Sequence, residues 1–450
     1  MQPEFAIHSE RVWINQRFQA ATVFIKNGKI SHLQSGKPEA FPCPLKDVGT
    51  DVLMPGLIDH HVHINEPGRT DWEGFETATK AAAAGGITTL VDMPLNASPV
   101  TTTPESFFKK KESTKNKRHV NCGFWGGIVP QNAANLEGLL DSGVLGIKAF
   151  LVPSGLDEFP NVTESDLRKG LPFIAQKGLP LLVHCELERP NGAGLLLGKH
   201  PKSYAAWLKS RPKEWENKAI EMMIRLCREF DCRTHIVHLS SAEALPMIEA
   251  ARVEGLPLTV ETCPHYLFFH SEDIPDSDTR FKCAPPIREK ANKEQLWDAL
   301  ENGRIDFVAS DHSPAPPALK HLKTGDLAKA WGGISGLQFL LPLVWTAAKK
   351  RGIGLENIAN WLSARPAEFI GFHQKKGKIA SGYDADLVIW NPEVTFAVEE
   401  KIIEHRHKIT PYLGQNLFGQ VEQTYVGGFK VFEEGVFKNL NKGKLLFSQV

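Results

Sequence analysis

Residues 52–63 read VLMPGLIDHHVH, an apolar run that ends in a cluster of histidines. The run is typical of a short buried strand. Because alternate side chains of an extended strand share a face, His61 and His63 point the same way. Two imidazoles on one face at the end of a strand supply half of a metal site. A pair of hydrogen-bonded core histidines would give the same pattern, so a metal site needs support from elsewhere in the chain.

Four further apolar runs of strand character carry one polar side chain each, near or at the end of the run. Burying a polar or charged side chain in such a place costs free energy unless it is paired or ligated. We therefore expect these side chains to share one site with His61 and His63. They are Lys148, His184, His238 and Asp311.

The middle of the chain alternates apolar runs with helical patterns, which favours a parallel sheet. Eight such β/α units over roughly 300 residues suit a (β/α)8 barrel. The active site of a barrel lies at the carboxyl ends of its strands, which is where the polar side chains fall. The eight predicted strands end near His63, Met93, Ile128, Leu151, His184, His238, Glu261 and Asp311.

Both ends of the chain have a different pattern, with short strands separated by turns. Near the N-terminus, Asn27-Gly28 stands between apolar stretches, which is a strong hairpin signal. The segment from Asp386 onward has the same pattern, with short strand-like stretches such as residues 386–390, 423–426 and 427–432. These segments predict β-structure outside the barrel.

The composition excludes several classes of protein. Apolar residues make up 42% of the chain and charged residues 23%, as in globular proteins. Lys plus Arg and Asp plus Glu both number 52, so no global field favours nucleic acid or an anionic membrane. No apolar run approaches a membrane span. The seven cysteines include no CxxC pair, which fits reduced thiols, and we expect a cytoplasmic protein.

Seven segments, in this order, resemble the cyclic amidohydrolases of the amidohydrolase superfamily, a group of dihydroorotases, hydantoinases, dihydropyrimidinases and allantoinases. The resemblance runs from about Leu53 to Asp386. The segments are GLIDHHVHINEPG, GIKAFL, LLVHCE, HIVHLSSAEAL, VETCPHYL, KCAPPIR and ASDHSP. The resemblance implies that residues 1–54 and 376–450 meet in one small β-sandwich domain beside a barrel of residues 55–375. It also implies a homo-oligomer, in this family commonly a tetramer.

The same resemblance implies two divalent metal ions, usually zinc, that share a bridging hydroxide. Imidazole and carboxylate ligands would also suit cobalt, manganese or iron. Lys148 would be carboxylated on its ε-nitrogen to N6-carboxylysine and bridge the ions, although a lysine paired with a nearby acid is the alternative. Asp311 would be both a ligand and the carrier of a proton. The implied ligands are His61, His63, Lys148, His184, His238 and Asp311.

Two departures from the family patterns reduce the number of substrates that the sequence favours. Dihydroorotases carry an arginine where this chain has Asn65, and dihydropyrimidinases carry a tyrosine where it has Pro153. An asparagine cannot hold a carboxylate as an arginine does. We expect a small neutral cyclic amide, bound with the help of Asn65, Asn96 and Ser154. Asn96 fits an ordinary turn about equally well.

Segments such as IKAFLVPSGLDEFP, SRPKEWENKAI and AWGGISGLQF resemble the allantoinase branch of the family. That branch implies hydrolysis of allantoin to allantoate, a step of purine degradation. Hydantoinase, dihydropyrimidinase or dihydroorotase activity is the first alternative. A non-enzymatic scaffold relative is a remote one, because such relatives lose the ligand positions that are intact here.

Overall fold

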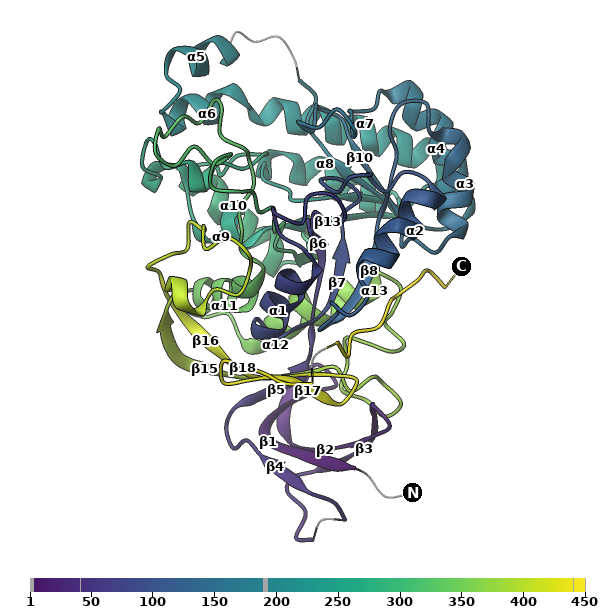
Figure 1. The fold of residues 1–450 in the computed structure, drawn as a ribbon, viewed down its shortest axis with the longest axis vertical. Helices are drawn as coiled ribbons and strands as arrows, with labels where there is room; N and C mark the ends of the chain where they lie inside the picture. Colours follow the sequence, from purple (N-terminus) through teal and green to yellow (C-terminus); the bar gives the residue numbers. More distant parts are fainter. Residues whose placement is uncertain (1–3, 41, 189–192, 440, 450) are drawn as a thin grey trace.

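The computed structural model describes residues 4–40, 42–188, 193–439 and 441–449. Parallel strands form a barrel, and the β-rich segments from the two ends of the chain lie below it (Figure 1). The barrel strands are rich in Val, Ile and Leu because both of their faces are buried. They are β6 (Leu57–Val62), β7 (Ile87–Asp92), β8 (Asn121–Phe124), β9 (Gly126–Gly127), β10 (Ile147–Phe150), β11 (Leu181–His184), β12 (Thr234–Ile236), β13 (Leu258–Thr262) and β14 (Phe307–Val308).

Two short strands together fill the third position of the barrel. β8 pairs with β7, β9 pairs with β10, and the buried Trp125 separates them. The indole nitrogen of Trp125 donates to the carbonyl of His60 at 2.7 Å, which ties this break to the first strand. A parallel bridge between Val62 and His312 brings the last strand back to the first. The ring therefore has eight strand positions, as the sequence predicts.

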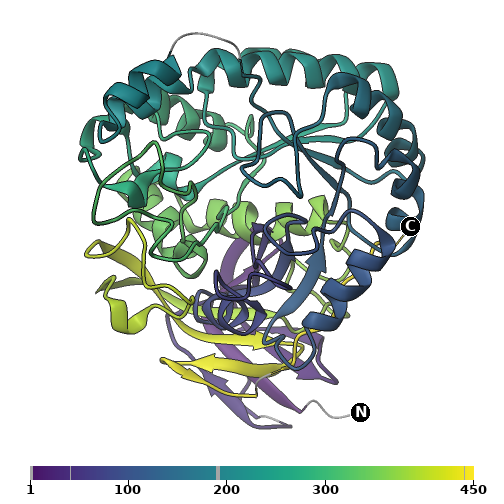
Figure 2. The same ribbon diagram turned by 45° about the horizontal axis from the view of Figure 1, so that its top comes forward.

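Helices follow the strands and surround the barrel (Figure 2). The long helix α7 buries one face, including Ile220, Met223 and Cys227, and leaves charged residues on the other. A capping box of Thr163 and Asp166 begins α4. The helices are α1 (Phe75–Ala84), α2 (Pro104–Ser113), α3 (Ala133–Asp141), α4 (Glu164–Gln176), α5 (Ala193–Lys199), α6 (Tyr204–Ser210), α7 (Lys213–Phe230), α8 (Leu245–Val253), α9 (Pro264–Phe268), α10 (Lys290–Glu301), α11 (Leu340–Lys350), α12 (Leu355–Ala359) and α13 (Arg365–Phe369).

Strands from both ends of the chain form one nine-stranded sheet with its own apolar core. Antiparallel pairing of β5 with β15 joins the two halves. The predicted hairpin turn is present at Asn27 and Gly28, whose φ angles are 51° and 73°. The strands are β1 (Phe5–Ile14), β2 (Arg17–Lys26), β3 (Lys29–Ser35), β4 (Leu45–Asp47), β5 (Val52–Pro55), β15 (Leu387–Ala397), β16 (Asn416–Val426), β17 (Phe429–Glu433) and β18 (Val436–Phe437).

The last described residues leave this sheet and return to the barrel, where Leu445 forms a bridge with Cys122 of β8. The predicted class, a (β/α)8 barrel with a small β-sandwich domain from both termini, is confirmed. Within the described ranges, no helix combines the length and the apolar character that a membrane crossing requires.

Candidate active site

A cavity of about 280 Å³ opens at the carboxyl ends of the barrel strands. Five of the six predicted ligands line it, and the imidazoles lie close together, with ring centroids 5.7 Å apart for His61 and His63 and 4.6 Å apart for His184 and His238. The fold therefore brings side chains from β6, β11 and the segments after β12 and β14 into one place. The five are His61, His63, His184, His238 and Asp311.

Three of these residues lie beyond the ends of their strands, His63 by one residue and His238 and Asp311 by more. β12 ends at Ile236 and β14 at Val308, earlier than the sequence predicts. His238 and Asp311 have φ angles of 40° and 45°, a left-handed backbone that few residues other than glycine adopt. This turn of the chain aims both side chains into the cavity. Such strained conformations gather at functional sites.

The donor atoms have the spacing that a bound metal ion requires. The Nε2 atoms of His61 and His63 lie 3.3 and 3.4 Å from Oδ1 of Asp311. Ligands that each lie about 2.0–2.2 Å from a tetrahedral ion are about 3.3–3.6 Å apart. His238 offers a further atom, because single ligand atoms of His61, His238 and Asp311 all lie within 4.8 Å of one another. The residues present therefore fit a metal centre.

Charge states at neutral pH also suit metal binding, which needs neutral imidazoles and an ionised carboxylate. Burial lowers the pKa of His63 to about 4 and lowers the pKa of His238 well below its usual value. Burial would raise the pKa of Asp311, but the neighbouring His61, His63 and His238 hold it well below its ordinary range.

Lys148 lies on β10 and is fully buried. Its Nζ has no hydrogen-bond partner among the described residues. Burial lowers the pKa of its ammonium group to about 8, against the opposing influence of Glu261 and Asp311. A buried amine without a partner is costly as a cation and reactive as a neutral base. These properties fit a lysine that is converted to a carbamate.

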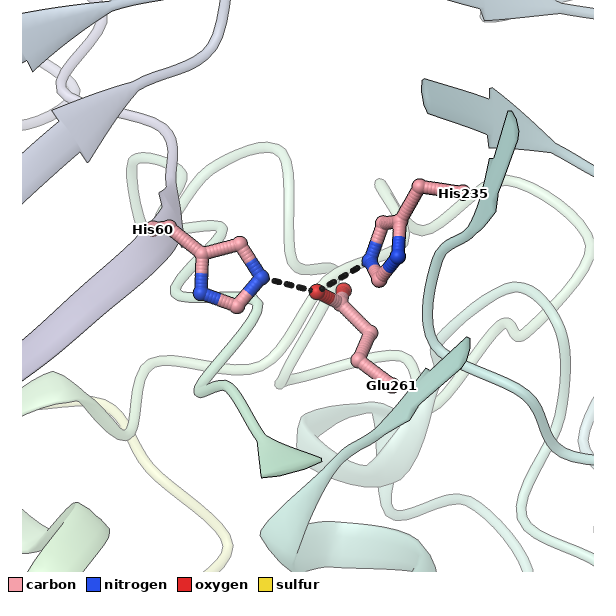
Figure 3. A group of neighbouring side chains, drawn as sticks. All are labelled: His60, His235 and Glu261. Carbon is pink, nitrogen blue, oxygen red and sulfur yellow. Dashed lines mark hydrogen bonds and ion pairs between the residues drawn. The ribbon is translucent and has the colours of Figure 1, made fainter. Parts of the chain in front are cut away.

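Glu261, at the end of β13, is a site residue that the sequence reasoning did not single out. It is fully buried and contacts three imidazoles from the two strands β6 and β12. Figure 3 shows two of these imidazoles, those of His60 and His235. Its Oε1 contacts Nδ1 of His61 and accepts the backbone N–H of His238 at 3.2 Å. Its Oε2 lies 2.5 Å from Nε2 of His60 and 3.1 Å from Nε2 of His235. One buried carboxylate therefore positions the ring of His61 and the backbone of His238, two predicted ligand residues.

The group of His60, His235 and Glu261 could also be a metal site, because its ligand atoms lie within 4.8 Å of one another. We interpret it as hydrogen-bonded, since both imidazoles already contact the same carboxylate oxygen. The ring of Phe369 covers it, with centroids 5.0 Å from His60 and 4.2 Å from His235. For Glu261, the only signal in the sequence was its place as an acidic residue near the end of an apolar, strand-like run.

A second buried carboxylate, Glu186, orients His184. Its Oε2 lies 2.7 Å from Nε2 of His184 and accepts a hydrogen bond of 2.5 Å from Arg211. Burial would raise the pKa of Glu186, but Arg211 and His184 hold it at about 2. Contact through Nε2 leaves Nδ1 of His184 available as the ligand atom.

Asp59, two residues before His61 on β6, accepts hydrogen bonds from the backbone. Its Oδ1 accepts the N–H groups of His61 and Ser310, each at 3.2 Å. It thereby joins the first barrel strand to the segment that carries Asp311. This contact fixes the spacing between the backbone of His61 and the segment that carries Asp311.

The three predicted substrate contacts have different surroundings. Asn96 and Ser154 line the cavity. The amide nitrogen of Asn96 lies 3.3 Å from Nδ1 of His63, and the hydroxyl of Ser154 donates to the carbonyl of Phe159 at 2.5 Å. Asn65 is fully buried outside the lining, with its amide nitrogen 3.4 Å from the carbonyl of Pro314. Direct substrate contact by these three residues stays a prediction.

The chain is similar to known proteins of one family. The model of the amidohydrolase family matches residues 52–431. A probable allantoinase of Oryza sativa subsp. japonica is 47% identical over 96% of this chain and 88% of its own length. An allantoinase of Streptomyces avermitilis is 46% identical over 98% of both chains.

Solved structures agree on the fold. An L-hydantoinase (dihydropyrimidinase) from Arthrobacter aurescens has a TM-score of 0.93 at 29% identity, covering 99% of this chain and 100% of its own. A dihydropyrimidinase from Brevibacillus agri has a TM-score of 0.90 at 26% identity, covering 100% of both chains. The shared fold thus extends over the barrel and the terminal sheet.

Proposed function

Because the chain belongs to the amidohydrolase family, we propose that it hydrolyses the hydantoin-ring amide of allantoin to give allantoate. The observation that carries this function is the identity of 46–47% to allantoinases over nearly the whole chain. The solved hydantoinase and dihydropyrimidinase structures are only 29% and 26% identical. Hydrolysis of other cyclic amides is therefore less well supported.

The proposal assigns the candidate centre to two divalent metal ions. His61, His63 and Asp311 would hold one ion, His184 and His238 the other, and Lys148, carboxylated to N6-carboxylysine, would contact both. When bound, the ions supply a water that ionises near neutral pH and a Lewis acid that polarises the ring carbonyl. Converging imidazoles, an ionised Asp311 and an unpartnered Lys148 support this assignment.

Asp311 has the position and charge of a general base. Its low pKa keeps it ionised, and its Oδ1 also accepts a hydrogen bond of 2.9 Å from the hydroxyl of Ser313. It would accept the proton of the attacking water at a carboxylate oxygen. It would then deliver that proton to the ring nitrogen as the carbon–nitrogen bond breaks and the new carboxylate forms. Asn96 and Ser154 would orient the ring from the cavity wall.

Several parts of the proposal rest on family resemblance. They are zinc as the metal, with cobalt, manganese or iron as alternatives, assembly as a homotetramer, and the division into residues 1–54 with 376–450 and residues 55–375. A cytoplasmic location is also part of the proposal, and the seven free cysteines fit a reducing compartment.

A panel of four substrates tests the function. Allantoin, hydantoin, dihydrouracil and dihydroorotate are compared by kcat/KM with the metal-loaded enzyme. We expect allantoin to rank first and dihydroorotate to show negligible turnover, because no arginine stands at position 65 to hold its carboxylate. A better rate with dihydroorotate or dihydrouracil would refute the assignment while leaving hydrolysis of a cyclic amide in place.

A further inference from the structure

Arg211 is a cation in the cavity wall with no role in the reaction proposed above. It lies between α6 and α7, and its side chain is 17% exposed. One N–H of its guanidinium group donates to Glu186 at 2.5 Å, and its central carbon lies 5.4 Å from the ring centroid of Trp207. The ring centroid of Trp215 lies 5.9 Å away, so three neighbours hold the group in one orientation.

The other N–H groups of this guanidinium make no hydrogen bond to the described residues, as the contacts of Arg211 show. Two other polar groups of the wall donate to the protein backbone. Lys282 donates to the carbonyl of Ala330 at 2.5 Å, and Ser154 donates to Phe159. Arg211 thus combines a fixed orientation with unused donors. That combination suits recognition of a ligand, because few degrees of freedom are lost on binding.

Arg211 also lies near the centre of the proposed chemistry. The same Glu186 oxygen that accepts from Arg211 contacts Nε2 of His184 at 2.7 Å. One carboxylate oxygen and one imidazole ring therefore separate the guanidinium from the proposed metal position. A substrate whose ring carbonyl reacts there would need a second polar group to reach Arg211.

We propose that Arg211 binds the carbonyl oxygen of the ureido group of the substrate and selects for ring amides that carry this group. The proposal rests on the proposed function. A guanidinium presents parallel N–H groups in one plane, and a urea carbonyl has two lone pairs that accept them. Simple hydantoin lacks the ureido group and leaves these donors of Arg211 without a partner. The discrimination arises from the hydrogen bond that hydantoin cannot make.

The variant Arg211→Met tests the proposal in the metal-loaded enzyme. We measure kcat/KM for allantoin and the inhibition constant of hydantoin as a competitor in the same assay. We expect kcat/KM for allantoin to fall about 10- to 100-fold, the range for losing a hydrogen bond to a charged group. The inhibition constant of hydantoin should change less than about threefold, because hydantoin does not use Arg211. Lys209→Met, at an exposed position near the end of α6 and two residues before Arg211, is the matched control and should change neither quantity.

Arg211→Lys keeps the positive charge beside Glu186 but loses the planar guanidinium group. It therefore tests the proposal even if the methionine variant does not fold. We expect it to lose allantoin turnover selectively as well. Equal weakening of allantoin and hydantoin, or a drop in metal content, would mean that Arg211 only positions His184 and would overturn the proposal. If the parent enzyme does not hydrolyse allantoin, the proposed function itself is wrong. If the parent hydrolyses allantoin but the variants do not discriminate, only the proposed role of Arg211 is wrong.

Discussion

Glu261 contacts Nδ1 of His61, and this leaves Nε2 of the same ring facing Asp311 at 3.3 Å. A carboxylate that accepts the hydrogen of one ring nitrogen keeps a lone pair on the other, which is the form a metal ligand needs. Burial would raise the pKa of Glu261, but His61 and His60 hold it well below its usual value. The charge that orients His61 therefore persists at neutral pH.

Glu261→Gln should weaken metal binding about 10- to 100-fold, because the amide accepts through only one oxygen and no longer imposes one tautomer on His61. Competition with a chelator measures the affinity, and nitrogen chemical shifts of His61 report the tautomer. Glu243→Gln, at a surface position, is the control. Unchanged affinity with an unchanged His61 tautomer would show that Glu261 serves only the packing of the barrel.

The purified enzyme should contain about two divalent ions per chain, as a two-metal hydrolytic site requires. His61→Ala and His238→Ala should lose metal and turnover together, while His373→Ala, at an exposed position, should lose neither. Elemental analysis of the dialysed variants measures the metal content. Full activity in metal-free protein would contradict the proposed mechanism.

Lys148→Ala should be nearly inactive because the proposed bridging carbamate is lost. Acetate or propionate, added together with metal, should restore part of the activity by placing a carboxylate in the space of the missing side chain. The parent enzyme treated with the same acids is the control and should not gain activity. A carbon NMR signal from labelled carbon dioxide on the parent, absent in the variant, would report the carbamate directly. An active parent without that signal speaks against carboxylation.

Asp311→Asn should keep the fold and lose most turnover, since an amide cannot carry the proton. General acid–base groups contribute about 100- to 10,000-fold, and we expect kcat to fall within that range. Thermal unfolding and metal content should be measured beside the rate, because Asp311 is also a proposed ligand. A variant within a few-fold of the parent would remove Asp311 from the proton path.

The sequence alone predicted the barrel, the terminal β-structure and the residues that carry polar groups to the strand ends. Local patterns suffice for these features. Alternation places His61 and His63 on one face, and Asn27-Gly28 needs only its own backbone preference to form a hairpin. A buried polar side chain at the end of an apolar strand stands out in the sequence because burial is costly without a partner.

Only the tertiary structure decided which atoms meet. Glu261 lies 201 residues from His60 and 26 from His235, and no local pattern pairs one carboxylate with imidazoles of other strands. Arg211 reaches the cavity because α6 and α7 place it beside Glu186. The packing buries Asn65 outside the cavity lining, a position that no local pattern gives, and its contact with substrate stays a prediction. Periodicity sets the face on which a side chain lies, whereas its partners depend on how distant strands pack in three dimensions.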